Sequence, residues 1–159
     1  MILFKPEHVV PILTGRKRQT RRRWPRGPRV RVGSLHQCRT RMLVKNTTFA
    51  RIAVDELRRE ELRAISDDDA RLEGYEDRAA YFGVWGRIHA DVQQQERELV
   101  YVITFHLAEV PCYGCRGAGV RQNGETCDEC EGSGFVPVRG PLRPEQARTL
   151  YSLTTGVCR

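Results

Sequence analysis

The chain has 159 residues and a formal net charge of +7, from 27 Lys and Arg against 20 Asp and Glu. This length suits one domain, or one domain with a small satellite, and excludes a large multidomain assembly. Hydrophobic residues make up 40% of the chain, which is enough for a core and excludes a wholly disordered basic tail. No apolar run approaches the roughly 18 residues of a membrane span, and the N-terminus lacks the pattern of a secretory signal. We therefore expect a soluble cytoplasmic protein with no membrane partner.

The positive charge is concentrated in the N-terminal third. Residues 1–51 contain 14 basic side chains and one acid, Glu7, whereas the remainder holds 13 basic and 19 acidic side chains. The net charge is thus the difference between a segment of +13 and a remainder of −6. Such a segment is a candidate contact for a polyanion.

The chain begins with a predicted helix, a basic loop and two strands. Residues 6–13 predict a short helix, because a proline stands near its start and Gly15 can stop it. Residues 16–31 hold nine basic side chains and no acid, and their Pro and Gly residues favour extended backbone or turns. Alternating side chains then predict strands at 35–42 and 49–54. The basic loop therefore lies between the first helix and the first strand-like region.

Two helices and a long strand follow. Ser66 before three aspartates predicts a helix start, since a hydroxyl caps the first turn and acids oppose its positive end. Gly74 is expected to end this helix. Residues 77–90 predict a second helix that buries three side chains at helical spacing, Phe82, Trp85 and Ile88. Residues 99–107 predict a strand that is apolar on both faces, which places it centrally in a sheet or barrel.

The pattern changes at Pro111. Residues 112–134 are rich in Cys and Gly and nearly lack large apolar side chains, so they cannot bury a core of their own. A metal would have to supply the folding energy. After residue 138 we expect a linker, a short helix at 144–150 and a loosely ordered tail.

Four of the six cysteines form two Cys-x-x-Cys pairs in an internal repeat. Each pair is followed by Gly-x-Gly, which lets backbone amides approach the sulfurs. Two such pairs predict a tetrahedral four-thiolate site for one structural Zn(2+) ion, with two disulfides or free thiols as the alternative. The predicted ligands are Cys112, Cys115, Cys127 and Cys130. We expect the other two cysteines to be a buried apolar group, Cys38, and an exposed side chain, Cys158.

The repeat resembles the Cys-x-x-Cys-x-Gly-x-Gly repeats of DnaJ-type cochaperones. In that family four repeats build two zinc sites, so two repeats here would build one. The chain has no His-Pro-Asp tripeptide, so the resemblance implies a zinc knuckle without cochaperone activity. The knuckle either staples the C-terminal region to the domain or contacts nucleic acid or protein; its arginines favour nucleic acid, whereas its acids oppose it.

The basic loop has the ingredients for binding a nucleic-acid strand, namely cations for phosphates and an aromatic ring for stacking. The candidate contact residues are Arg16, Arg18, Arg21, Arg22, Arg23 and Trp24. The alternative is a solvated basic face or a ribosome-like tail. Composition alone leaves both interpretations open.

Motifs in residues 1–110 resemble the ASCH domain family. They are the signature Gly15-x-Lys17-x-x-Thr20-x-Arg22, the turn Val32-Gly33-Ser34 before a strand, the helix end Asp69-Ala70-Arg71-Leu72-Glu73-Gly74-Tyr75 and a final strand at 101–105. The resemblance implies an α+β fold, a PUA-like β-barrel with helices at its rim and a cleft between the basic loop and the acidic helix end. Together with the cysteine repeat, it divides the chain into an ASCH domain (1–110), a zinc knuckle (111–138) and a C-terminal tail with a short helix (139–159).

The same resemblance implies candidate catalytic residues. Some ASCH proteins are similar to amidohydrolases that deacylate a modified cytidine, and others are thought to bind or cut RNA. By motif match, the working groups of the amidohydrolases fall on Lys17, Thr20 and Glu73. A desolvated lysine can take the proton of the weakly nucleophilic threonine hydroxyl, and the glutamate can deliver a proton to the leaving amine. The alternatives are a phosphate clamp for Lys17, a turn hydroxyl for Thr20 and a surface ion pair for Glu73.

The favoured function is binding of RNA or another single-stranded nucleic acid, or of a modified nucleoside, with a base held in a cleft between the Lys17 loop and Glu73. One alternative is a hydrolase, either an amidohydrolase acting on acylated cytidine or a ribonuclease, that uses Lys17, Thr20 and Glu73. Another is a zinc-stabilised protein-interaction adaptor. The sequence leaves the identity of the ligand and the oligomeric state open.

Overall fold

The computed structural model describes residues 1–42, 44, 47–89 and 97–155, and the chain forms two compact units. The unit here named the terminal unit consists of Met1–Gly15, Leu35–Ala53 and His106–Arg159. The other, named the central unit, consists of Arg16–Ser34 and Val54–Phe105. Two long strands, β4 (Thr48–Glu61) and β5 (Leu99–Pro111), contribute residues to both units. The division into 1–110, 111–138 and 139–159 stays a prediction.

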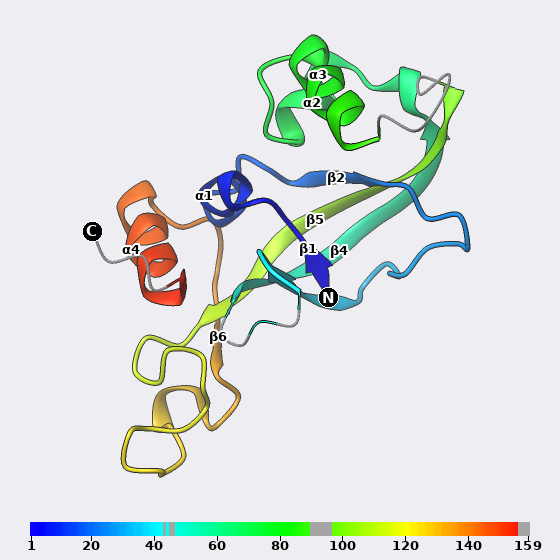
Figure 1. Cartoon of the computed structure of the whole chain (residues 1–159). Coiled ribbons are helices and arrows are strands. Elements are labelled where there is room, and N and C mark those ends of the chain that lie inside the picture. Colours follow the sequence, from blue (N-terminus) through cyan, green and yellow to red (C-terminus); the bar gives the residue numbers. More distant parts are fainter. Residues whose placement is uncertain (43, 45–46, 90–96, 156–159) are drawn as a thin grey trace. The chain divides into compact units, whose positions relative to one another are not determined.

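The strands form one mixed sheet (Figure 1). Besides β4 and β5 it contains β1 (Ile2–Leu3), β2 (Gln19–Arg22), β3 (Leu35–Arg39) and β6 (Phe135–Pro137). The order is β1-β3-β4-β5-β2, with β6 pairing to β5 beside this path. β1 runs parallel to β3, whereas β3 is antiparallel to β4, and β2 and β6 are antiparallel to β5.

This sheet is open, so the predicted closed barrel is not confirmed. Among the residues that the structure describes, β1 and β2 end the strand path and do not pair with each other. Closing a barrel requires its two edge strands to pair along a shared length. β1 has only two residues and β2 only four, so neither edge offers such a length. The structure does confirm a mixed sheet with several helices.

The strands predicted at 35–42 and 49–54 are present with different ends. β3 stops at Arg39, where its register with β4 shifts. β4 continues beyond Val54 to Glu61 through a charged stretch, in which Arg58 and Glu60 pair at 3.1 Å. The apolar alternation ends at Val54, so periodicity could not reveal an extension that is stabilised by ion pairs.

The helices α2 (Asp67–Leu72) and α3 (Arg78–Ile88) lie in the central unit and begin where the sequence predicts. The Ser66 hydroxyl accepts a hydrogen bond from an N–H three residues on, at 3.1 Å, and caps α2. Asp77 caps α3 in the same way at 2.8 Å. Gly74 has a φ of +89° immediately after α2, a backbone conformation that favours glycine and ends the helix.

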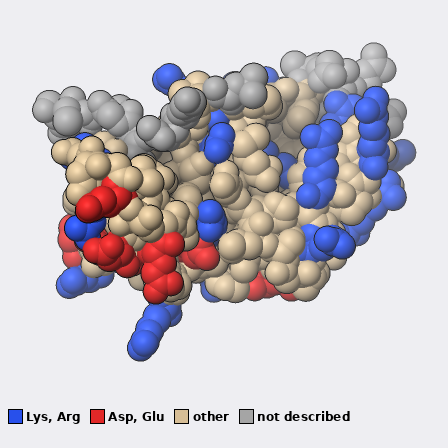
Figure 2. Space-filling model, turned by 90° about the horizontal axis from the view of Figure 1, so that it is seen from below, with Lys and Arg blue, Asp and Glu red and all other residues tan. Residues whose placement is uncertain are grey.

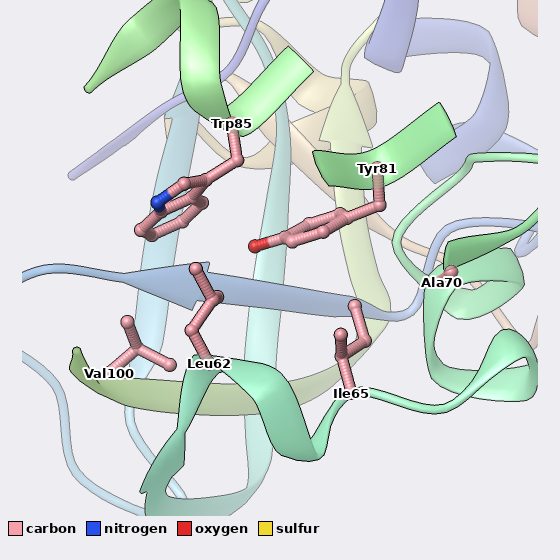
Figure 3. Packing of buried hydrophobic residues seen from close by; sticks show 6 residues of the cluster. All are labelled: Leu62, Ile65, Ala70, Tyr81, Trp85 and Val100. Atoms are coloured by element: carbon pink, nitrogen blue, oxygen red, sulfur yellow. The ribbon is translucent and has the colours of Figure 1, made fainter. Parts of the chain in front are cut away.

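An apolar cluster connects these helices to the strands of the central unit (Figure 3). It consists of Leu62, Ile65, Ala70, Tyr81, Trp85 and Val100. Leu62 begins a 3-10 turn, Leu62–Ala64, that follows β4. The rings of Tyr81 and Trp85 stack with centroids 5.9 Å apart.

The burial predicted for α3 is wrong in part. Trp85 is buried, but Phe82 is half-buried and Ile88 is 53% exposed. Residues spaced by three drift around a helix by about 60° at each step, so Ile88 turns away from the face that Trp85 shares with Tyr81. The i, i+4 pair of Tyr81 and Trp85 therefore forms the core face.

Two helices of the terminal unit contact each other. They are α1 (Val9–Leu13), which follows a 3-10 turn at Pro6–His8, and α4 (Pro144–Thr155). Leu13 is fully buried and its carbonyl accepts the N–H of Leu142, just before α4, at 2.9 Å. The helix predicted at 6–13 is confirmed, and the one predicted at 144–150 is confirmed but longer.

The remaining expectations concern single cysteines and the membrane. Cys38 on β3 has no exposed surface, as predicted, whereas Cys158 lies outside the described residues. None of the helices in the described part of the chain combines the length and the apolar character that crossing a membrane requires.

Candidate functional site

β2 carries the signature segment into the central unit. It pairs antiparallel with β5, and Arg18, just before it, donates its N–H to a carbonyl at the end of α2 at 2.9 Å. Side chains alternate along a strand. Gln19 and Arg21 therefore point to one face of β2, and Thr20 and Arg22 point to the other.

Lys17 lies inside the central unit with 1% of its surface exposed. Its Nζ donates to the Gln19 carbonyl at 3.0 Å, to the Glu73 carbonyl at 2.6 Å and to Glu73 Oε2 at 2.8 Å. Glu73 caps the C-terminal end of α2, where the helix dipole favours a cation. Burial lowers the pKa of Lys17, although Glu73 opposes this shift. The ammonium group thus joins β2 to the end of α2 and does not reach solvent.

Arg21 extends this contact into a network. Its Nη1 donates to Gln19 Oε1 at 2.7 Å and lies 3.3 Å from Glu73 Oε1. Its Nη2 lies 2.7 Å from Glu60 Oε1 on β4 and 3.2 Å from Asp69 Oδ2 on α2. The Arg21 side chain has no exposed surface, so its charge is balanced by carboxylates of the protein and not by an external anion.

Arg58 completes the network, with contacts of 3.1 Å to Glu60 and 3.5 Å to Asp69. Burial alone would raise the pKa of Asp69, but Arg21 and the surrounding hydrogen bonds lower it overall. Three cations therefore face three carboxylates in what we name the six-charge cluster. Its members are Lys17, Arg21, Arg58, Glu60, Asp69 and Glu73.

Thr20 lies apart from the two residues with which it is predicted to act. It is buried, with 4% exposure, but strand alternation places its side chain on the face of β2 opposite to Arg21. Lys17 Nζ instead donates to Gln19 and Glu73. The structure therefore brings together Lys17 and Glu73, and does not add Thr20 to them.

The six residues predicted to contact nucleic acid differ in exposure. Arg16, Arg18 and Arg23 are exposed, Arg22 and Trp24 are half-buried, and Arg21 is buried. Arg23 forms an ion pair with Glu98. The basic segment thus separates into cations that stabilise the fold and cations that face solvent.

Three further exposed arginines lie in the same segment, after β2. Together with two of the predicted residues they form what we name the exposed arginine set: Arg16, Arg18, Arg26, Arg29 and Arg31. The ion pairs found among the described residues include none of these five. Figure 2 shows one face of the molecule on which several Lys and Arg side chains stand close together.

Sequence reasoning missed Arg58 and Glu60, and treated Asp69 as an acid of the first helical turn and as part of the ASCH-like helix end. The available signal was the charged stretch after Val54, in which basic and acidic side chains continue the spacing of a strand. This charged stretch predicts a buried ion-pair network only when a buried cation such as Arg21 is known to face it.

A second candidate site lies in the terminal unit, where the four predicted cysteines converge. Their Sγ atoms all lie within 4.8 Å of one another, with 3.8 Å between Cys112 and Cys127 and 3.6 Å between Cys115 and Cys130. All four are buried and none forms a disulfide. A tetrahedral ion with metal–sulfur bonds of about 2.3 Å needs sulfurs about 3.8 Å apart. These cysteines can therefore hold one metal ion.

The glycines of the repeat shape this site. The N–H of Gly119 donates to Cys115 Sγ at 3.2 Å, and that of Gly134 donates to Cys130 Sγ at 3.3 Å. A Cβ on Gly119 would collide with the carbonyl of Gly132, and one on Gly134 would lie 2.5 Å from a carbonyl of the first knuckle. The two knuckles therefore cross so closely that only glycine fits at these positions.

The thiols of this site differ in acidity. Burial opposes ionisation of Cys115, but the Gly119 N–H and the neighbouring thiols lower its pKa to about 7. Burial raises the pKa of Cys112 to about 12. A bound cation would supply the positive charge that four clustered thiolates require.

Two donors on α3 are buried without an acceptor. Among the residues that the structure describes, the Tyr81 hydroxyl and the Trp85 indole N–H have no hydrogen-bond partner. Figure 3 shows both rings within the apolar cluster. Burial raises the pKa of Tyr81, and the charge of Glu73 adds to this effect. Unpartnered buried donors are rare in folded proteins. Substitutions that remove one of these two donors therefore test how much its burial costs in stability.

No protein-family model matches the chain, and no curated protein matches it. Among solved structures, an ASCH domain from Lactobacillus crispatus is 17% identical, with coverage of 64% of this chain and 70% of that chain and a TM-score of 0.49. A protein from Enterococcus faecalis is 16% identical, with coverage of 65% and 68% and a TM-score of 0.49. A mutant ASCH protein from Zymomonas mobilis is 16% identical, with coverage of 97% and 96% and a TM-score of 0.47. These values do not show that the chain belongs to the ASCH family, so membership stays a prediction from the sequence motifs.

Proposed function

We propose that the protein binds RNA or another single-stranded nucleic acid through the segment 16–34. The observation that carries this proposal is the exposed arginine set, in which five solvent-facing guanidinium groups lack ion pairs among the described residues. The segment contains nine basic side chains and no acid. Its two buried cations, Lys17 and Arg21, are neutralised within the six-charge cluster and anchor the segment rather than contact phosphate. The ASCH-like motifs support a base or modified base as the group that is recognised.

The test is the salt dependence of binding to a single-stranded RNA oligonucleotide. Each phosphate contact should contribute about 0.7 to the magnitude of the slope of log K against log salt. The variant Arg26→Ala/Arg29→Ala removes two such contacts, so the magnitude of the slope should decrease by about 1.4. The matched control is Arg139→Ala/Arg148→Ala, which removes two exposed arginines of the terminal unit and should leave the slope unchanged. Binding that is absent, or insensitive to salt, would contradict the proposal.

A hydrolase is the second candidate function. A buried lysine with a lowered pKa, paired at 2.8 Å with a carboxylate, supports it. In such a reaction the Thr20 oxygen would attack an acyl carbonyl, Lys17 would accept the hydroxyl proton, and Glu73 would return a proton to the leaving amine before water releases the acid. The position of Thr20 on the opposite face of β2 favours binding over this mechanism.

Hydrolysis is tested with acylated cytidine and with single-stranded RNA as substrates. Thr20→Val is the informative variant, because it removes the hydroxyl and keeps the buried shape. If the hydrolase is real, the unmodified protein turns over one of the two substrates and the variant loses that activity. Lack of turnover of both substrates rejects the hydrolase, and full activity in Thr20→Val rejects the role of Thr20.

We also propose that the four-cysteine site holds one Zn(2+) ion with a structural role. Cys112, Cys115, Cys127 and Cys130 would complete a tetrahedral shell and leave no open position for a substrate. Elemental analysis of the purified protein should give about one zinc per chain, and Cys112→Ser/Cys115→Ser should give none. The third alternative, a protein-interaction adaptor, has no specific contact in its favour.

A further inference from the structure

Trp24, Tyr101 and Arg59 form an aromatic and cationic surface in the central unit. The ring centroids of Trp24 and Tyr101 lie 6.0 Å apart with an angle of 38° between their planes. The guanidinium of Arg59 lies 5.8 Å from the Tyr101 ring. The three residues come from the turn after β2, from β5 and from β4, so the fold, rather than the local sequence, brings them together.

This surface is accessible to a ligand. Both aromatic rings are half-buried and Arg59 is exposed. Tyr101 stands opposite Arg22 in the pairing of β5 with β2, and alternation separates it from Val100, which packs into the apolar cluster with α3. The rings therefore lie off the face that the helices of the central unit cover.

Charge around these rings matches a polyanion. Arg26, Arg29 and Arg31 follow Trp24 within the same turn-rich segment and are exposed. The N–H of Gly27 donates to the carbonyl of Trp24 at 3.1 Å, so Arg26 lies in the turn that begins at Trp24. Accessible aromatic rings together with nearby cationic side chains are the combination by which proteins bind single strands without reading sequence.

We propose that Trp24 and Tyr101 are a stacking platform for the bases of a single-stranded nucleic acid, with Arg59 and the neighbouring arginines on its phosphates. This inference rests on the proposed function and deepens it, because it separates base stacking from phosphate attraction and assigns each to different residues. The platform prefers a single strand over a duplex, since the bases of a duplex are already stacked on each other.

The experiment measures the affinity of the full-length protein for a single-stranded RNA of about 12 nucleotides and for the duplex of the same sequence. Trp24→Leu and Tyr101→Leu remove the flat rings and retain apolar volume. Each should weaken single-strand binding about tenfold and leave the slope of log K against log salt unchanged. Duplex affinity should not change. Tyr113→Leu is the control, because this tyrosine is 50% exposed and lies in the terminal unit.

Tryptophan fluorescence tests the stacking of Trp24 directly, and loss of folding would not reproduce the expected signal. The chain has two tryptophans, of which Trp85 is buried. Saturating RNA should quench the emission of Trp24 by stacking, and in Trp24→Phe, where only Trp85 emits, the quenching should disappear.

The outcomes separate the two proposals. If the unmodified protein binds the single strand but both leucine variants bind it equally well, the platform is rejected and the function stands. If quenching persists in Trp24→Phe, the platform is likewise rejected. If the unmodified protein does not bind single-stranded RNA even at low salt, the proposed function itself fails.

Discussion

Two buried clusters, the four cysteines and the six-charge cluster, differ in how their charges are balanced. The cysteine cluster draws all its members from 19 consecutive residues and holds only groups that become negative, so its charge would be balanced by the cation that we propose. The members of the six-charge cluster lie on β2 or just before it, on β4, and on α2 or at its C-cap. Three cations there face three carboxylates. The first cluster is thus suited to an external cation, whereas the second balances its charges within the fold.

Removal of the metal should have the largest effect. Structural zinc contributes on the order of 10 kcal/mol of binding free energy in small zinc modules, and residues 112–134 have no apolar core to replace it. A strong chelator, or Cys112→Ser/Cys115→Ser, should abolish amide protection in these residues, as measured by hydrogen exchange. Amides of β2 in the central unit should stay protected.

The control for this prediction is Cys38→Ala, which removes a buried cysteine outside the cluster and should leave the metal content unchanged. Loss of protection in β2 to the same extent as in 112–134 would show that the six-charge cluster also depends on the metal.

Breaking the Lys17–Glu73 pair should have the next largest effect. Lys17→Met leaves the Glu73 carboxylate with Arg21 but removes a cation that binds three oxygens, and loss of one partner from a buried ion pair costs about 3 to 5 kcal/mol. Denaturant unfolding of Lys17→Met should show this loss, and a double variant with Glu73→Gln should recover part of it. Lys5→Met is the control, because Lys5 is exposed in a 3.9 Å pair with Glu7 and its loss should have little effect. Equal stability of the two lysine variants would contradict the prediction.

The contrast between the clusters also explains what the sequence could predict. The clustering of the four cysteines could be predicted, because they are close in sequence and each Cys-x-x-Cys turn brings two thiols together; the bound Zn(2+) ion stays a prediction. Lys17 and Glu73 were identified by motif resemblance, but Arg58 and Glu60 were not, because a pair of strands and a helix must form before these charges meet. The barrel was not confirmed for a similar reason: alternation predicts strands, whereas closure depends on the lengths of edge strands such as β1.

Acid should weaken the six-charge cluster through Asp69. Arg21 and its neighbours lower the pKa of Asp69 overall, so the stabilisation from this carboxylate is fully present above about pH 4, the unfolded value. It is lost as the pH falls through the lower pKa of the folded state. Asp69→Asn should lower the free energy of unfolding by about 2 kcal/mol at neutral pH. Below about pH 4 the stability of this variant should fall less steeply than that of the unmodified protein.

Thermal unfolding at a series of pH values measures this effect. Asp128→Asn is the matched control, because Asp128 is an exposed carboxylate that pairs with Arg121 at 3.0 Å and should barely change the profile. If the stability of Asp69→Asn falls with pH in parallel with that of the unmodified protein, the acid sensitivity does not come from Asp69 and the prediction is contradicted.

The smallest expected effect, and the one of opposite sign, concerns Tyr81. Its hydroxyl is buried and has no partner within the described part of the chain, whereas every charged group of the adjacent six-charge cluster has at least one. Removing an unpartnered buried hydroxyl deletes a desolvation cost while the ring keeps its stack on Trp85, so Tyr81→Phe should be neutral or raise the stability by about 1 kcal/mol. Tyr113→Phe, at an exposed ring, should change nothing. A clear loss of stability in Tyr81→Phe, measured by denaturant unfolding, would mean that the hydroxyl has a bound partner in solution, such as a buried water. The aromatic cluster would then depend on an outside ligand, as we propose for the cysteine cluster.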